Sequence, residues 1–553
     1  MGGDNIRMGR AVSNGLTATF AVLTATDTDA AARVLDAALE SPRDAIHEAA
    51  LTATLKRRNL AGQRIILQQW ESMPPRWREI VERNRDRMTP VLREAVVGAD
   101  MRRCAQGCAA AVALQQYELI PALLNAIGDP LNPNADLIAS TLMGLAEQLY
   151  GELASGAVRG RRDPQITRQH VISSLETWVL RYGRHRRREV IEAFLLLVNR
   201  ENVSLKQILQ EPHHDCLPVV LDVLAKSTRN GVMRLLLGLL DDPHAPLSAL
   251  TVVGNRTDAT FLRYLLRKVG REPSMAARQN LKRLTSVAWL QAGDVTLDEL
   301  DDAGQHAAVR LVTASGISRV HAFSTIEYLL DHGRPGGRRA AAEALNEFQG
   351  AQANALALRA MEDSDPVVQS TVILQLRRRG IPSVLARLVE MLESPHSMVR
   401  QAARKSLAEF SFKRYLAAFD ILDEEVRQST GQLVKKVDSH TIPLLQAEFR
   451  ARARTRRLRA VAIARAIEVV AEVEADLIEL LHDEDHVVRI EAAAALAAGV
   501  SEASVTALQE TLADRSAAVV DAVRRSLASR MQFTQLRAAP DTFPDQTTND
   551  TMP

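Results

Sequence analysis

The sequence predicts an all-α fold, an α-solenoid of stacked antiparallel helix pairs that wind as a right-handed superhelix. One phrase recurs at intervals of about 31 residues through the C-terminal half, and a fixed period of this length is typical of stacked repeat arrays. Aromatic residues make up only 4% of the chain and alternating hydrophobic patterns are nearly absent, which favours helices over β-strands. A single closed core of 553 residues would be unusually large, whereas a solenoid has no such limit.

The repeat unit is clearest in residues 385–407. Apolar residues at helical spacing from Leu385 to Leu392 predict a first helix, and Pro395 then ends it because proline cannot continue a helix. Val399, Ala403 and Leu407 follow at positions i, i+4 and i+8, so they form one apolar stripe along a second helix. One helix pair cannot cover its own apolar faces, so each unit requires the next.

The same phrase defines the domain organisation, because it returns at four further places: residues 338–345, 368–376, 488–496 and 519–527. We therefore expect residues 231–531 to form a repeat solenoid. Residues 30–230 look helical, but their period decays. They are either degenerate helical repeats of the same solenoid, which we prefer, or a separate helical domain. Residues 1–29 are a poorly defined N-terminal segment, and residues 532–553, rich in polar residues and proline, are expected to be a disordered C-terminal tail.

The stretch from Leu480 to Leu496 resembles the HEAT repeat family, and more closely its short bacterial form first noted in phycobilisome lyases. The resemblance implies that Asp483 and Arg489 belong to a ladder of Asp–Arg pairs that cross-links successive turns. Gln369 and Val520 replace the ladder arginine in two other units, so we expect the ladder to be interrupted. Positive charge is mostly arginine and alanine is abundant, which favours a GC-rich bacterial source.

Two arginine clusters are candidates for binding anions. The first contains residues that could form an anion or nucleic-acid patch: Arg184, Arg186, Arg187, Arg188, Trp178 and Tyr182. We expect the two aromatic residues, four apart, to share a helix face, and single-stranded nucleic acid is bound by such aromatic platforms beside arginines. The second cluster spans residues 450–465. For both clusters we prefer a solvated edge between repeats, with anionic proteins or nucleic acid as alternatives. The net charge of only +2 gives no global argument for nucleic acid.

The sequence contains few residues that could hold a metal ion or perform catalysis. Residues 211–216 (Glu-Pro-His-His-Asp-Cys) are the only dense group of potential ligands, and we interpret them as a polar turn between helices because adjacent side chains rarely converge on one ion. Cys104 and Cys108 lie four apart, and we interpret them as buried small side chains, with a redox or metal pair as the alternative. We therefore expect no catalytic residue, no cofactor and no metal.

These observations favour a non-enzymatic scaffold that binds one or more other proteins along the concave groove of the solenoid. In HEAT-like arrays the second helix of each pair lines that groove. The exposed positions on those helices are our candidate partner-binding residues: Arg377, Arg378, Gln401, Arg404, Lys405, Gln428, Arg524 and Arg525. The alternatives are a nucleic-acid-binding HEAT-like protein that uses the arginine clusters, and a lyase- or chaperone-type protein that acts on a partner protein.

Membrane insertion is not expected, because the sequence has no run of 18 or more apolar residues. Residues 16–25 faintly resemble the apolar region of a signal peptide, but threonines dilute them. We therefore expect a cytoplasmic protein.

Overall fold

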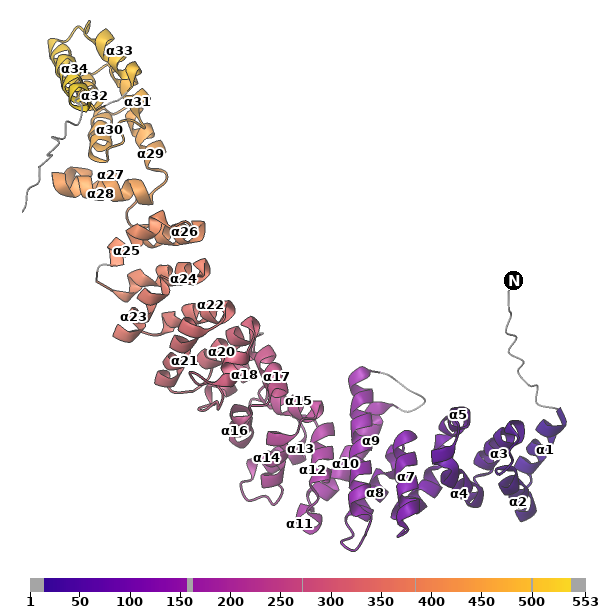
Figure 1. Cartoon of the computed structure of the whole chain (residues 1–553). Helices are drawn as coiled ribbons and strands as arrows, with labels where there is room; N and C mark the ends of the chain where they lie inside the picture. Colours follow the sequence, from indigo (N-terminus) through magenta and orange to yellow (C-terminus); the bar gives the residue numbers. More distant parts are fainter. Residues whose placement is uncertain (1–13, 157–162, 271, 383, 499–500, 539–553) are drawn as a thin grey trace, which may run out of the picture. The chain divides into compact units, whose positions relative to one another are not determined.

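The chain is helical throughout its described part. The computed structural model describes residues 14–156, 163–270, 272–382, 384–498 and 501–538. Within those ranges the regular structure consists of α-helices α1 to α34 and seven short 3-10 helices, with no β-strand (Figure 1). The predicted all-α solenoid class is confirmed. The chain divides into two compact units, unit 1 (Met1–Leu329) and unit 2 (Leu330–Pro553).

Unit 1 contains helices α1 to α20 and most of α21. Their bounds are α1 (Asn14–Ala25), α2 (Asp29–Ala38), α3 (Asp44–Arg57), α4 (Leu60–Gln69), α5 (Pro75–Arg83), α6 (Thr89–Val97), α7 (Met101–Ala113), α8 (Ile120–Ile127), α9 (Ala135–Ser155), α10 (Pro164–Val179), α11 (Tyr182–His185), α12 (Arg188–Leu197), α13 (Val203–Gln210), α14 (Leu217–Lys226), α15 (Asn230–Leu239), α16 (Leu247–Asn255), α17 (Ala259–Gly270), α18 (Met275–Lys282), α19 (Val295–Glu299), α20 (Asp302–Ala314) and α21 (Arg319–His332).

Unit 2 contains the helices that carry the recurring phrase. Their bounds are α22 (Pro335–Ala344), α23 (Ala351–Ala360), α24 (Pro366–Leu376), α25 (Val384–Glu390), α26 (Ser397–Ser406), α27 (Phe412–Ala418), α28 (Glu424–Val437), α29 (Thr441–Phe449), α30 (Arg454–Ala466), α31 (Glu474–Leu480), α32 (His486–Leu496), α33 (Glu502–Thr511) and α34 (Ala517–Ala538).

Alternate helices of unit 2 pack on one another and form two layers. In the second-helix layer α22 packs on α24, α24 on α26, α28 on α30, α30 on α32, and α32 on α34. In the first-helix layer α29 packs on α31 and α31 on α33. Each helix pair therefore covers the apolar faces of its neighbours, as expected of a repeat array.

Aspartates fix where the second helices begin. Asp365 accepts a hydrogen bond from the backbone N–H of Val367 at 2.9 Å, and Asp485 accepts one from the N–H of Val487 at 2.8 Å. Each carboxylate satisfies a backbone donor that the first turn of its helix leaves free, which is why Asp is favoured at this position. Pro366 follows directly after the first of these caps, where the missing N–H costs nothing.

The core of unit 2 consists of small and branched aliphatic side chains. Leu376, Leu407 and Leu496, which end the phrase in three repeats, are all fully buried. Ala403 and Ala492 are also fully buried, so neighbouring second helices can approach closely at these positions. This is the apolar stripe that the sequence predicted for the second helix.

The predicted domain boundaries differ from the observed division. The two units are divided between Leu329 and Leu330, whereas the sequence placed a boundary at residue 230. Helix α34 extends to Ala538, so residues 532–538 of the predicted disordered tail are helical, and residues 539–553 lie outside the described part. Helix α1 occupies much of the predicted N-terminal segment. None of the helices in the described ranges is long and apolar enough to cross a membrane.

Candidate functional site

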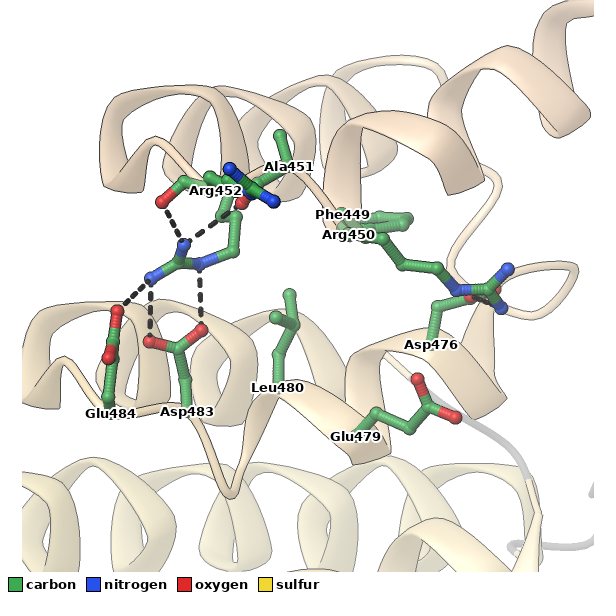
Figure 2. Close-up of a pocket in the computed structure, with 10 residues that line it drawn as sticks. Phe449, Arg450, Ala451, Arg452, Asp476, Glu479, Leu480, Asp483 and Glu484 are labelled. Atoms are coloured by element: carbon green, nitrogen blue, oxygen red, sulfur yellow. Dashed lines mark hydrogen bonds and ion pairs between the residues drawn. The ribbon is translucent and has the colours of Figure 1, made fainter.

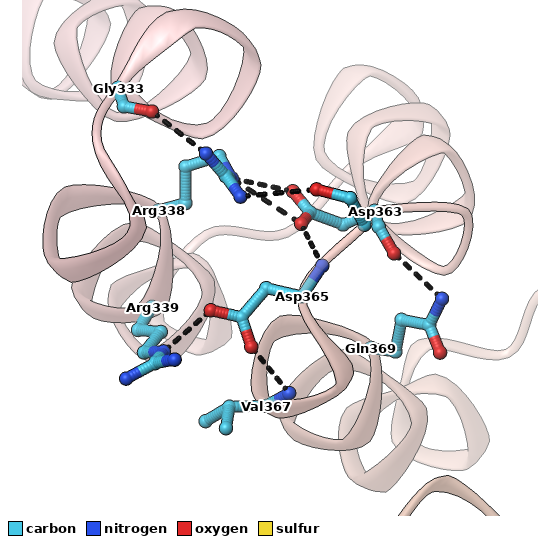
Figure 3. A network of polar contacts seen from close by, with 8 residues as sticks. Gly333, Arg338, Arg339, Asp363, Asp365, Val367 and Gln369 are labelled. Carbon is cyan, nitrogen blue, oxygen red and sulfur yellow. Dashed lines mark hydrogen bonds and ion pairs between the residues drawn. The ribbon is translucent and has the colours of Figure 1, made fainter. Parts of the chain in front are cut away.

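Unit 2 contains ion pairs that join successive repeats, and Figure 3 shows the set around α22 and α24. Arg338 on α22 lies 3.0 Å from a carboxylate oxygen of Asp363 and donates a hydrogen bond of 3.0 Å to the carbonyl of Gly333. Its neighbour Arg339 lies 2.6 Å from Asp365. Burial alone would raise the pKa of Asp365, but hydrogen bonds from Arg339 and a backbone N–H hold that pKa below its usual value.

The same arrangement recurs 31 positions at a time near the C-terminus. Arg457 on α30 lies 2.8 Å from Asp483, and Arg489 on α32 lies 2.9 Å from Asp514. Arg489 also donates a hydrogen bond of 2.7 Å to the carbonyl of Asp483. The side chains of all four residues are largely buried, at most 13% exposed. We call this series of inter-repeat pairs the arginine ladder.

Gln369 occupies the slot of the ladder arginine on α24 and keeps only part of its bonding. Its side-chain amide donates a hydrogen bond of 2.7 Å to the carbonyl of Asp363, the bond that Arg489 makes to Asp483. A glutamine carries no charge and has a shorter side chain, so it provides the hydrogen bond within its own repeat without an ion pair to the next.

Figure 2 shows a cleft between the turn that joins α29 to α30 and helix α31. Its volume is about 550 Å³ and its lining includes Arg450, Arg452 and Asp476. Asp476 is buried and lies 2.8 Å from both Arg450 and Gln446. The buried charges of the cleft are therefore already paired within the protein. A cleft whose buried charges are satisfied offers no activated nucleophile or base.

The second arginine cluster supplies much of this pairing. Six of its seven arginines lie within ion-pair distance of an acidic residue: Arg450 with Asp476, Arg454 with Asp485, Arg456 with Glu448, Arg457 with Asp483, Arg459 with Asp420, and Arg465 with Glu491. Arg452 is exposed. The cluster is thus mainly a set of intramolecular contacts, and most of its charge is neutralised.

The first arginine cluster lies in unit 1 and is also partly neutralised. Arg187 pairs with Asp136 on α9, and Arg188 pairs with Asp222 on α14. Arg184 and Arg186 are exposed. The acidic partners come from flanking helices far away in the sequence, so the segment itself gave no sign of them.

The expected aromatic platform in this cluster is wrong in one respect. Helix α10 ends at Val179 and Tyr182 begins the short helix α11, so Trp178 and Tyr182 do not share a helix face. Both rings instead contact His185, with ring centroids 5.8 Å and 5.5 Å apart respectively. Burial lowers the pKa of His185, so its ring is neutral at pH 7 and packs as a small aromatic group.

The cysteines and the predicted turn at residues 211–216 do not converge on a common centre. The sulfur atoms of Cys104 and Cys108 are 3.9 Å apart, and both side chains are buried on α7. The bond to Cys108 and burial together raise the pKa of the Cys104 thiol. Cys216 donates instead to the carbonyl of Val179, and His214 accepts from the N–H of Cys216. In the described ranges no three His, Cys, Asp or Glu residues are grouped as metal ligands would be.

The candidate partner-binding residues differ from one another in their surroundings. Arg377, in the 3-10 helix η5 (Arg377–Arg379), pairs with Glu409. Gln428 is exposed on α28, where its amide lies 3.3 Å from Glu424. Arg524 and Arg525 are exposed on α34. Arg524 lies 3.8 Å from the carboxylate of Asp521, and Arg525 donates to the backbone carbonyl of the same residue.

Four candidates are exposed together on η5 and α26: Arg378, Gln401, Arg404 and Lys405. The sequence analysis missed two exposed apolar residues on the same second-helix layer, Leu374 on α24 and Met398 on α26, which are 41% and 49% exposed. We call these six residues the basic face. Their spacing along the helices was the signal available in the sequence, because they lie outside the apolar stripe.

Comparison with known proteins supports the repeat assignment. A comparison with curated protein sequences finds no match. The similar solved structures include the karyopherin Kap121p bound to the SUMO protease Ulp1p, with 9% identity, 95% of this chain and 77% of that chain covered, and a TM-score of 0.21. They also include the Pds5–Scc1 complex, with 10% identity, coverage of 94% and 81%, and a TM-score of 0.20. Scores this low carry no argument about function.

Residues 323–408 match the family model described as HEAT repeats, and this range includes the basic face. The similarity to HEAT repeats is thereby confirmed at this level, whereas the phycobilisome-lyase form and the bacterial source stay predictions. The chain is a helical protein that contains HEAT repeats between residues 323 and 408.

Proposed function

We propose that the protein is a non-enzymatic scaffold that binds other proteins along the second-helix layer of unit 2, on the groove side expected to be concave. We also propose a cytoplasmic location. The carrying observation is a division among the basic residues of unit 2. Arginines in the ladder and in the second cluster are used by neighbouring repeats, whereas Arg378, Arg404 and Lys405 are exposed and lie in no described ion pair.

The chemistry of the described residues supports a binding role over catalysis. Buried acids such as Asp476 and Asp483 are held by arginines, and such pairing keeps a carboxylate ionised and occupied. A general acid or base requires a group free to exchange a proton with a substrate. The cleft of Figure 2 contains charged residues, but its buried acids already have partners.

The nucleic-acid alternative has less support. In the first cluster, Asp136 and Asp222 each neutralise one arginine, and His185 fills the space between the two aromatic rings. Phosphate binding requires cations that are free to release counterions, and base stacking requires an accessible ring face.

The test is affinity capture from a lysate of the source organism with the full chain as bait, followed by quantitative mass spectrometry. The double variant Arg404→Glu/Lys405→Glu should lose at least one protein that the wild type retains. The matched control is Lys413→Glu/Arg414→Glu, which makes the same charge change at two exposed positions of α27 in the first-helix layer. This control should retain the protein.

Both variants should keep the far-UV circular dichroism of the wild type, because all four side chains are exposed. The captured protein is then purified and its binding to the bait measured directly. Identical capture profiles for wild type and both variants would refute the proposal, as would capture that nuclease treatment abolishes.

A further inference from the structure

The basic face has a charge pattern that is unusual within this nearly neutral chain. Helix α24, the 3-10 helix η5 and helix α26 contain no Asp or Glu, although charged residues make up 25% of the sequence. Arg378, Arg404 and Lys405 project from these elements and are exposed. Elsewhere in unit 2, acidic residues from adjacent repeats neutralise the arginines of the ladder.

Two contacts fix how α24 and α26 lie beside each other. The Ser406 hydroxyl donates a hydrogen bond of 3.0 Å to the carbonyl of Ile373, 33 residues earlier in the sequence. Arg377 pairs with Glu409, 32 residues later. A residue on α24 therefore lies next to the residue 32 or 33 positions later. This register places Leu374 beside the last turn of α26, which carries Arg404 and Lys405.

Apolar side chains lie among these cations. Leu374 is 41% exposed and Met398 is 49% exposed, and each lies on a helix that supplies or adjoins the exposed basic residues. Met398 precedes Lys405 by seven residues, about 10 Å along a helix. Exposed apolar residues between unpaired cations favour a ligand that contributes both anionic and apolar groups.

Helix-end stabilisation explains only part of this pattern. Arg404 and Lys405 occupy the last turn of α26, where cations interact favourably with the helix dipole. The dipole does not explain the exposure of Leu374 and Met398. Helices α24 and α26 also contain no aromatic residue, so they offer no stacking surface for the bases of a single-stranded nucleic acid.

Acidic residues limit the extent of the face along the second-helix layer. Glu343 is exposed on α22, and Glu424 and Glu425 are exposed at the start of α28. A negatively charged ligand is repelled at both limits, so its anionic part must lie across α24 and α26. Two packed helices span about 20 Å, which an extended segment of about six residues crosses.

We infer that the basic face binds a short acidic segment of a partner protein, with Asp or Glu side chains opposite Arg378, Arg404 and Lys405 and apolar side chains against Leu374 and Met398. This inference rests on the proposed scaffold function and names the partner chemistry. It places the main contact in the HEAT repeats at residues 323–408 and not at Arg524 and Arg525.

The test selects peptides of about 12 residues, twice the inferred segment, from a random phage-displayed library on the immobilised full chain. The enriched peptides should combine several Asp or Glu residues with Leu, Met or Ile. Labelled synthetic copies are then titrated by fluorescence anisotropy at about 0.05 to 0.3 M NaCl, a range in which screening of surface charges increases.

The triple variant Arg378→Glu/Arg404→Glu/Lys405→Glu should weaken this binding roughly tenfold or more and reduce its salt dependence. Lys413→Glu/Arg414→Glu should leave both unchanged. The exposed apolar residues are tested by Leu374→Ser/Met398→Ser, which should weaken binding at every salt concentration and leave the salt slope as in wild type.

Enrichment of neutral or basic peptides, no enrichment, or equal binding by the triple variant would overturn the inference. Tighter binding of oligo(dT) of about 20 nucleotides, lost in the triple variant, would assign the face to nucleic acid instead. The scaffold proposal fails separately. If capture of a protein depends on Arg404 and Lys405 but no acidic peptide is enriched, only the partner chemistry is wrong.

Discussion

The arginine ladder makes a quantitative prediction at Arg457. This side chain is 9% exposed and lies 2.8 Å from Asp483, whose side chain is 7% exposed. Arg457 also donates hydrogen bonds of 3.0 Å and 2.8 Å to the carbonyls of Ala451 and Arg452. Arg457→Ala removes the pair and leaves a buried carboxylate with one backbone donor, the N–H of Asp485.

Breaking a buried ion pair by removing one partner typically costs about 3–5 kcal/mol. Each 1.4 kcal/mol corresponds to about a tenfold change in an equilibrium constant, so local opening around α30 and α31 should increase about a hundredfold or more. In a repeat array the effect should decrease with distance from the altered repeat. Native-state hydrogen exchange of the full chain, read by mass spectrometry, measures this region by region.

The matched control is Arg454→Ala on the same helix. Arg454 lies 3.3 Å from Asp485, but its side chain is 52% exposed, so its pair contributes about 0–1 kcal/mol. The double variant Arg457→Leu/Asp483→Leu should recover part of the loss, because it leaves no unpaired buried charge. An increase below about tenfold for Arg457→Ala, or an equal effect of the control, would refute the reasoning.

Three further predictions concern the stability of unit 2. Leu407 is fully buried, so Leu407→Ala should destabilise its repeat by about 2–5 kcal/mol, measured as faster hydrogen exchange in α24 and α26 than in α34. Glu468 has a φ of 55°, so Glu468→Gly should raise the thermal midpoint, with a gain of up to about 1 kcal/mol, whereas Gly380→Ala at φ 63° should lower it. The pKa of Asp365 is lowered in the fold, so its contribution is present above the unfolded pKa of about 3.9 and is lost as pH falls through the folded pKa. Asp365→Asn should therefore have a thermal midpoint that decreases less between pH 7 and pH 3, about one unit below that pKa, and an unchanged slope would contradict this.

Sequence periodicity identified the helices of unit 2 well, because burial and spacing coincide there. Val399, Ala403 and Leu407 form the stripe that the pattern indicated, and all three are fully buried. Where the register shifts, the pattern was less informative. Tracking the Val slot placed it at Leu458, which puts Arg459 in the ladder position, but the ladder arginine of α30 is Arg457.

The pairing of charges could not be read from local sequence. Arg187 and Asp136 are 51 residues apart, and Arg188 and Asp222 are 34 residues apart, so a count of charges within the segment overstated its positive potential. The break after Val179 was similarly hidden, since Trp178 and Tyr182 have the spacing of one continuous helix. Helical spacing predicts a shared face only when the helix continues between the two residues.

The ladder also has a consequence for how such a chain can gain or lose repeats. Arg457 pairs with Asp483, and Arg489 pairs with Asp514. Removing residues 483–513 would delete one full period and bring Asp514 to the position of Asp483, opposite Arg457. Every remaining buried charge would keep a partner. The interchangeable module is therefore cut at the aspartate, inside a turn between two helices, and duplication or loss of such modules changes the length of the array without leaving an unpaired buried charge.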